Sequence, residues 1–143
     1  MSTSKKLILD ANILLRGVFG VRVRQLLEAY QEAVDFYTPE TCVAEALRHI
    51  PRIAKHKSLD PAESEKELHR LIRLFIGVVD ESLYGQLEEW AHLRIAARDV
   101  DDWPVVAASL LINAPIWTED RDFFGSGIAT WTTDRIEIYL RDV

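Results

Sequence analysis

The sequence contains a single cysteine, no long apolar run and no excess of positive charge. Cys42 alone cannot form an internal disulfide, which favours a reducing compartment. The longest uninterrupted apolar stretches, such as residues 105–108, are far shorter than the roughly 20 residues that cross a bilayer. With 17 Lys and Arg against 23 Asp and Glu, the net charge of −6 provides no global attraction to nucleic acids or anionic membranes. We therefore expect a cytoplasmic protein that does not enter a membrane.

Glycine and proline are also scarce, at 6 and 5 residues, which excludes collagen-like and low-complexity chains. The composition of 48% hydrophobic and 28% charged residues is typical of a folded globular protein. A chain of 143 residues is long enough to bury one core without disulfides. We expect a single domain over residues 1–143.

Short apolar runs alternate with helical patterns along the whole chain. The pattern predicts strands at residues 6–9, 35–37, 114–118 and 128–131. It predicts helices over residues 19–34, from Thr38 past Glu45, from Asp60 to about 76, from 83 to about 98, over 105–113 and over 133–140. Fully apolar short strands separated by helices predict a three-layer α/β/α sandwich around a short parallel sheet.

Three local signals refine these boundaries. Thr38 is placed to cap a helix in which Pro39 takes the first position, and Pro51 is expected to end or kink that helix. Asp60 and Glu63 have the spacing of a capping box at the next helix start. Residues 77–80 are predicted to form only a brief extended link, and the helix over 105–113 should be buried on most sides because it is apolar nearly all round.

Acidic residues gather where predicted strands end and where the apolar helix begins. Asp10 and Asp120 follow apolar strands, and the carboxyl ends of parallel strands form the edge where ligands bind. The other acids at such junctions are Asp99, Asp101, Asp102 and Asp122. If folding brings these carboxylates together, their repulsion has to be relieved by protonation or by a cation. Oxygen ligands without a matching set of His or Cys favour Mg²⁺ or Mn²⁺ over zinc.

A simpler interpretation remains open for each acid taken alone. Asp10 and Asp102 could be helix caps, and the remaining acids could be solvated loop charges. The recurrence of acids at several junctions favours the metal site, because capping does not require so many carboxylates and their repulsion would be costly.

Four segments carry a more specific pattern, in the order Leu-Ile-Leu-Asp-Ala-Asn-Ile-Leu (7–14), Val-Ala-Glu-Ala-Leu (43–47), Asp-Trp-Pro-Val-Val-Ala-Ala (102–108) and Trp-Thr-Glu-Asp-Arg-Asp-Phe (117–123). Together they resemble the PIN domain family of metal-dependent ribonucleases, most of all the VapC-type toxins of toxin–antitoxin pairs. The resemblance implies four catalytic acids, which are Asp10, Glu45, Asp102 and Asp120. It implies a Mg²⁺ or Mn²⁺ site formed by Asp10, Asp102, Asp120 and Asp122, with Asn12, Thr118 and Asp99 in support.

The same resemblance implies the reaction and the partners. We expect hydrolysis of RNA phosphodiester bonds that leaves 5′-phosphate and 3′-hydroxyl ends, a homodimer, and a small antitoxin that blocks the acidic cleft with a basic side chain. Spacing alone favours a different role for Glu45, which lies opposite the apolar stripe of Val43, Leu47 and Ile50 and would be a solvated residue. The resemblance instead places it in a polar cleft.

An acidic cleft repels RNA, so substrate binding requires positive charge at its rim. Residues 48–57 contain no acid, and we expect RNA to contact Arg48, Arg52, Lys55 and Lys57, together with Arg16. The same residues also fit an ordinary solvated helix end, where cations favour the helix dipole, and both interpretations stay open.

Two other functions remain possible. A PIN-like module that binds protein or RNA without catalysis would share the fold. A phosphatase of the haloacid dehalogenase type also begins with an apolar strand that ends in Asp, but it requires a second Asp two residues later, where this chain has Asn12.

Overall fold

The computed structural model of the protein describes residues 4–95 and 100–141. Its five strands form one sheet in the order β3-β2-β1-β4-β5. Their bounds are β1 (Lys5–Leu9), β2 (Val34–Pro39), β3 (Ile76–Val79), β4 (Ile116–Trp117) and β5 (Thr130–Trp131). All four pairings between these strands are parallel. The chain therefore starts at the centre of the sheet with β1, builds one half outward, and then returns to build the other half.

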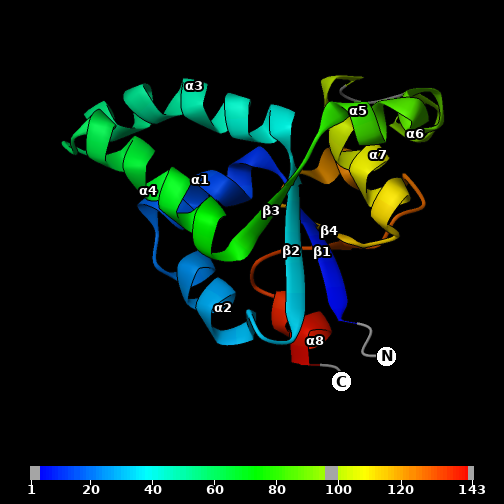
Figure 1. Cartoon of the computed structure of the whole chain (residues 1–143), viewed down its shortest axis with the longest axis horizontal. Helices are drawn as coiled ribbons and strands as arrows, with labels where there is room; N and C mark the ends of the chain where they lie inside the picture. Colours follow the sequence, from blue (N-terminus) through cyan, green and yellow to red (C-terminus); the bar gives the residue numbers. More distant parts are fainter. Residues whose placement is uncertain (1–3, 96–99, 142–143) are drawn as a thin grey trace.

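Helices cover both faces of this sheet. They are α1 (Ala11–Phe19), α2 (Arg22–Tyr30), α3 (Glu40–His56), α4 (Pro61–Phe75), α5 (Glu81–Tyr84), α6 (Glu88–Ile95), α7 (Trp103–Ile112) and α8 (Ile136–Arg141), with single turns at η1 (Gly85–Leu87), η2 (Val100–Asp102) and η3 (Arg121–Phe123). Figure 1 shows α1–α4 on one side of the sheet and α5–α7 on the other. This arrangement confirms the predicted α/β/α sandwich. Within the described ranges, no helix combines the length and apolar character that a membrane crossing requires.

The core lies between the central strands and α7. Leu7, Ile8 and Leu9 of β1 have no exposed surface, and Trp117 of β4 is equally buried. Helix α7 contacts β1, β2 and β4 with one side and α5 and α6 with another. Because α7 is covered on most sides, its sequence is apolar almost all round, as predicted, and each large side chain buried there stabilises the fold by about 1.5–3 kcal/mol.

The first helix begins much earlier than the sequence pattern predicts. Instead of one helix over residues 19–34, the chain forms α1 directly after β1 and a separate α2. The Asp10 carboxylate accepts a hydrogen bond of 3.0 Å from the backbone N–H of Ile13, so the strand leads into the helix without a loop. The Gly20 N–H closes α1 by donating to the Arg16 carbonyl at 2.8 Å. Residue 34, assigned to the predicted helix, instead begins β2.

The predicted cap at Thr38 is wrong. Thr38 belongs to β2, and its hydroxyl donates to the Leu9 carbonyl of β1 at 2.8 Å, so it is not available for the helix. Helix α3 begins at Glu40 and continues through Pro51 to His56, so Pro51 does not end it. Pro51 is exposed, where water can satisfy the carbonyl that loses its N–H partner. Asp60 caps α4 as predicted, because its carboxylate accepts from the Ala62 N–H at 3.0 Å, but Glu63 contacts Lys66 instead of completing a capping box.

Several short elements also differ from the sequence prediction. Residues 76–79 form the edge strand β3 rather than a link, in register with β2 from Phe36↔Ile76 to Pro39↔Val79. The helix expected to run to about 98 is divided into α5, η1 and α6, and residues 96–99 lie outside the described residues. Strands β4 and β5 are two residues long, and the last helix starts at Ile136 rather than 133. The bounds of the strands are set by pairing with neighbouring strands, which a local pattern does not show.

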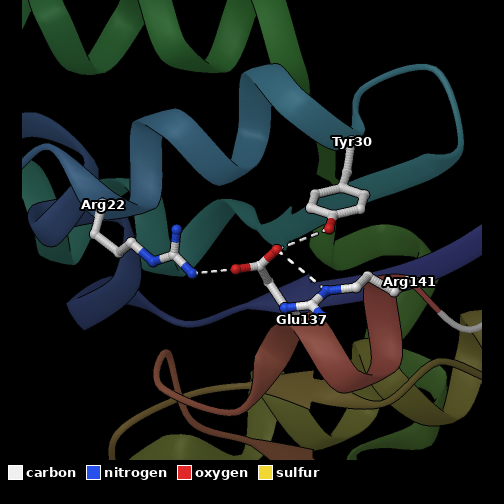
Figure 2. Close-up of polar contacts among 4 residues, drawn as sticks. All are labelled: Arg22, Tyr30, Glu137 and Arg141. Atoms are coloured by element: carbon white, nitrogen blue, oxygen red, sulfur yellow. Dashed lines mark hydrogen bonds and ion pairs between the residues drawn. The ribbon is translucent and has the colours of Figure 1, made fainter.

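The C-terminal helix is attached to α2 by a small polar cluster (Figure 2). Glu137 pairs with the Arg22 guanidinium, accepts a hydrogen bond of 2.8 Å from the Tyr30 hydroxyl and lies 3.5 Å from Arg141 Nε. The hydrogen bond from Arg22, followed by that from Tyr30, holds the pKa of Glu137 below its ordinary value. The ionised carboxylate therefore helps to fix α8 against α2.

Replacing Glu137 with Gln should lower the melting temperature at pH 7 by roughly 2–4 °C. Because the folded pKa is depressed, the contribution of the carboxylate is present above 4.5, the ordinary value, and is lost as the pH falls through the lower folded value. The difference between wild type and variant, followed by circular dichroism, should therefore narrow below this pH. Glu65→Gln, at an exposed position of α4, is the control. A difference that stays constant down to pH 3 contradicts the prediction.

Candidate active site

The carboxyl ends of β1 and β4 border a small polar hollow of about 290 Å³. We call it the acidic notch, because five acids line it: Asp10, Glu45, Asp101, Asp102 and Asp120. They come from the end of β1, from α3, from η2 and from the segment after β4. The structure thus brings the four acids that the sequence nominated as catalytic into one hollow, from positions up to 110 residues apart (10 and 120).

Asp10 is the buried member of the notch, with a relative exposure of 6%. One carboxylate oxygen accepts from the Ile13 N–H at 3.0 Å, and the other accepts from the Thr118 hydroxyl. Burial raises the pKa of Asp10 to about 6, although both hydrogen bonds act in the opposite direction, and the charges of Asp120 and Glu45 raise the pKa further. Asp10 is therefore both a helix cap and a carboxylate that is costly to ionise without a cation nearby.

Three acids form a tighter group at one side of the notch. One carboxylate oxygen from each of Asp102, Asp120 and Asp122 lies within 4.8 Å of the others. The Asp120 N–H donates to the Thr118 hydroxyl oxygen at 2.9 Å, and the Asp122 N–H donates to the Asp120 carboxylate at 2.9 Å. Of the four residues nominated as metal ligands, these three cluster, whereas Asp10 lies in the same notch outside the group.

The composition of this group fits a hard divalent cation. Its donors are carboxylate oxygens alone, which is the ligand type of Mg²⁺ and Mn²⁺ rather than of zinc. All three acids are partly exposed, so an ion can reach them from solvent. Like charges this close repel each other, and a bound cation relieves that repulsion.

Thr118 connects the two acids that end neighbouring strands. Its side chain donates to Asp10 and accepts from the backbone of Asp120, and its relative exposure is 1%. Asn12, the other supporting residue, is exposed and lines the notch. Asp99, also expected to support the site, lies outside the described residues.

Glu45 is exposed on α3, as its spacing predicts, and it lines the notch, as the resemblance implied. The same helix adds lining residues that the sequence analysis did not assign to the site, which are Thr41, Cys42 and His49. Their spacing of three or four positions from Glu45 was the available signal. Burial, followed by the charges of Asp10 and Glu45, raises the pKa of the Cys42 thiol, which is therefore neutral and unreactive at pH 7.

The five cations expected to contact RNA occupy three places. Arg48 lines the notch itself, and Arg52 and Lys55 are exposed farther along α3. Arg16 and Lys57 line a second, mainly apolar hollow of about 580 Å³ between α1, α2 and α3, which shares Asn12 with the notch. None of these five enters an ion pair formed within the described ranges, whereas Arg22, Arg24, Lys66, Arg70 and Arg141 do.

Comparison with known proteins identifies the family. A PIN domain model matches residues 8–141. The chain belongs to the PIN domain family. A search of curated protein sequences returns no match.

Solved structures share the fold of this PIN domain at low sequence identity. A chain of VapBC2 from Rickettsia felis, bound to a DNA fragment from their promoter, has a TM-score of 0.66 and 14% identity, covering 89% of this chain and 98% of that one. PAE2754 from Pyrobaculum aerophilum has a TM-score of 0.70 and 14% identity, covering 97% and 91%. A toxin–antitoxin complex from Klebsiella pneumoniae gives a TM-score of 0.64 and 15% identity, covering 89% and 97%.

Replacing Asp10 with Asn should stabilise the metal-free PIN domain at pH 8. A folded pKa of about 6 against an ordinary value of 3.8 means that ionisation of Asp10 opposes folding as the pH rises through this interval, by at most about 3 kcal/mol. Asn does not ionise, so it has no cost of this kind. The melting temperature of Asp10→Asn in EDTA should therefore exceed that of wild type above pH 6 and lie closer to it near pH 4. A difference that does not change with pH contradicts the prediction.

Proposed function

We propose that this PIN domain is an endoribonuclease that uses Mg²⁺ or Mn²⁺ to hydrolyse RNA phosphodiester bonds. The observation that carries the proposal is the group of three carboxylates within 4.8 Å, at the rim of a notch that holds further acids. Two of the three follow β4, at the edge of a parallel sheet where ligands bind.

Each acid has a distinct task in this proposal. Asp102, Asp120 and Asp122 supply oxygen ligands. Asp10 adds negative charge behind them, and its carboxylate keeps acceptor capacity beyond its two hydrogen bonds. Glu45 contributes from α3, directly or through a water. A divalent ion held by these acids would lower the pKa of a bound water molecule and offset the charge that develops on the phosphoryl oxygens.

The cations of α3 that form no ion pair with the acids of the described ranges supply the contact with RNA. Arg48, Arg52 and Lys55 follow each other at intervals of about one turn of α3, roughly 5.4 Å. They lead away from the notch and are not neutralised by ion pairs with the acids of the described ranges. In a protein of net charge −6, this local row supplies the attraction that RNA needs, with Arg16 and Lys57 extending it to the neighbouring hollow.

We further propose that the protein acts in the cytoplasm as the toxin of a toxin–antitoxin pair and forms a homodimer. The fold it shares with chains of VapBC2 and of the Klebsiella pneumoniae toxin–antitoxin complex supports this proposal. The acidic notch fits the expected mode of inhibition, in which a basic side chain of a small antitoxin neutralises the carboxylates. Inhibition of cleavage by a small protein encoded beside it distinguishes a toxin from a housekeeping nuclease.

Of the alternatives, a binding module without catalysis would have no use for the clustered ligands. The haloacid dehalogenase alternative lacks its second carboxylate, because residue 12 is Asn, and membership of the PIN domain family argues against it.

Replacing Asp102 with Asn should lower the cleavage rate of a labelled single-stranded RNA in Mn²⁺ by about 100-fold or more, because one cation ligand loses its charge. Sequencing of the wild-type products should show 5′-phosphate and 3′-hydroxyl ends. Asp35→Asn, at an exposed position of β2, controls for the loss of a carboxylate elsewhere. Cleavage that survives in folded Asp102→Asn, or in EDTA, would refute the proposed enzyme.

Replacing Arg52 and Lys55 together with Ala should raise KM several-fold with little change in kcat. Each lost phosphate contact should also reduce the slope of log KM against log salt by about 0.7. Arg73→Ala, which removes an exposed cation from α4, is the matched control. Equal KM values for the two variants and wild type would show that the row on α3 is only a solvated helix face.

A further inference from the structure

Two of the three clustered carboxylates lie on a single connection between β4 and β5. We call residues 118–128 the acid loop, because it carries Asp120 and Asp122. At its start, the Thr118 N–H donates to the Trp131 carbonyl of β5 at 3.0 Å. In its middle, the Phe123 side chain is 1% exposed and anchors η3 in the core. Near its end, Ser126 is buried, and its hydroxyl accepts from the Ile128 N–H at 3.3 Å.

Arg94 of α6 holds the end of this loop from outside. Its guanidinium Nη1 donates to the Ser126 carbonyl at 2.9 Å. The neighbouring Gly127 has a φ of +82°, and a Cβ added there would lie 2.5 Å from Arg94 Nη1. The guanidinium therefore occupies the space that a side chain at 127 would fill, and glycine satisfies both the backbone conformation and the contact.

Arg94 thereby joins the two parts of the chain that supply the ligands. Asp120 and Asp122 lie on the acid loop, whereas Asp102 ends η2, which packs with α7 against α6. Helices α6 and α7 pack together with η2. The distance from Asp102 to Asp120 and Asp122 therefore depends on the position of these helices relative to the acid loop. Cation binding requires ligand distances within about 0.2 Å of their preferred values, so a small shift of the loop weakens it.

We propose that Arg94 is a positioning residue of the metal site, which aligns the acid loop with Asp102 through Ser126 and Gly127. This inference rests on the proposed function, because it concerns the same three carboxylates. Arg94 does not line the acidic notch, so it does not contact the cation or the RNA there. Its effect is on the affinity for the cation and, through it, on the cleavage rate when the cation is limiting.

The test measures Mn²⁺ binding directly, by calorimetry on the intact protein at 25 °C, with RNA cleavage as a separate readout. Arg94→Ala should weaken Mn²⁺ binding about tenfold, in the range seen when support of metal ligands is removed. Cleavage at limiting Mn²⁺ should fall in proportion and recover at saturating Mn²⁺. Amide exchange of residues 118–126 in the absence of metal should be faster. Arg70→Ala on α4 should change none of these.

Two further variants separate positioning from general stability. Arg94→Lys retains a donor for the Ser126 carbonyl and should restore part of the Mn²⁺ affinity. Gly127→Ala displaces the guanidinium without removing it, so its effect on Mn²⁺ affinity should be smaller in an Arg94→Ala background than in wild type. Arg94→Lys also tests the proposal if Arg94→Ala fails to fold, because its Mn²⁺ affinity should then lie below that of wild type.

Wild-type Mn²⁺ affinity in folded Arg94→Ala, even with a lower melting temperature, would overturn this inference and leave the proposed function intact. Full additivity of Arg94→Ala and Gly127→Ala would overturn it as well. If the wild-type protein itself binds no Mn²⁺, the proposed function fails and this inference fails with it.

Discussion

The crowding of carboxylates at one edge of the sheet is the constraint on which the rest of the site depends. Parallel strands end side by side, so acids that follow β1 and β4 meet whatever their separation in sequence. Burial makes this arrangement costly, and it raises the pKa of Asp10 to about 6. Hydrogen bonds from Ile13 and Thr118 offset part of that cost. A cation bound by the partly exposed acids would offset more, which makes the notch suited to divalent metal chemistry.

Some acids near the notch are held in hydrogen bonds that support the fold, whereas others face the notch. Glu119 and Asp120 are adjacent in sequence, but the Glu119 carboxylate accepts from the Thr133 N–H at 2.7 Å and from its hydroxyl at 2.6 Å. Thr133 in turn accepts from the buried indole N–H of Trp117 at 3.0 Å. Glu119 therefore fixes the turn that precedes α8, while Asp120 faces the notch. Because Glu119 satisfies the donors of Thr133, the neighbouring carboxylate of Asp120 is not needed there and can face a ligand.

The positive charges are divided in a similar way. The arginines of α2 pair with glutamates of other helices, Arg22 with Glu137 of α8 (Figure 2) and Arg24 with Glu67 of α4. Arg70 pairs with Glu67 within α4. The row on α3 has no such partners among the acids of the described ranges. Arg48 of this row lines the notch itself, whereas Arg52 and Lys55 are exposed farther along α3, where positive charge can attract anionic groups without competing with a metal for the carboxylates.

The strand-ending acids, the apolar α7 and the α/β class could be predicted from sequence, because each depends on residues close together in the chain. Leu7 to Leu9 form a strand on their own apolar pattern, and Asp60 caps α4 through a residue two positions away. Other features depend on distant partners. Thr38 is a strand residue because it pairs with Val78 of β3, and its hydroxyl donates a hydrogen bond to the Leu9 carbonyl of β1. Residues 76–79 form a strand by pairing with β2.

The site divides along the same line. By itself the sequence determined which carboxylates would be present and that an acid would follow each of two central strands. Only the tertiary structure decided that Asp122 groups with Asp102 and Asp120 while Asp10 stays outside, and that Cys42 and His49 line the notch. Distances of a few ångströms between segments far apart in sequence are set by packing and long-range hydrogen bonds, and no local pattern of residues encodes them.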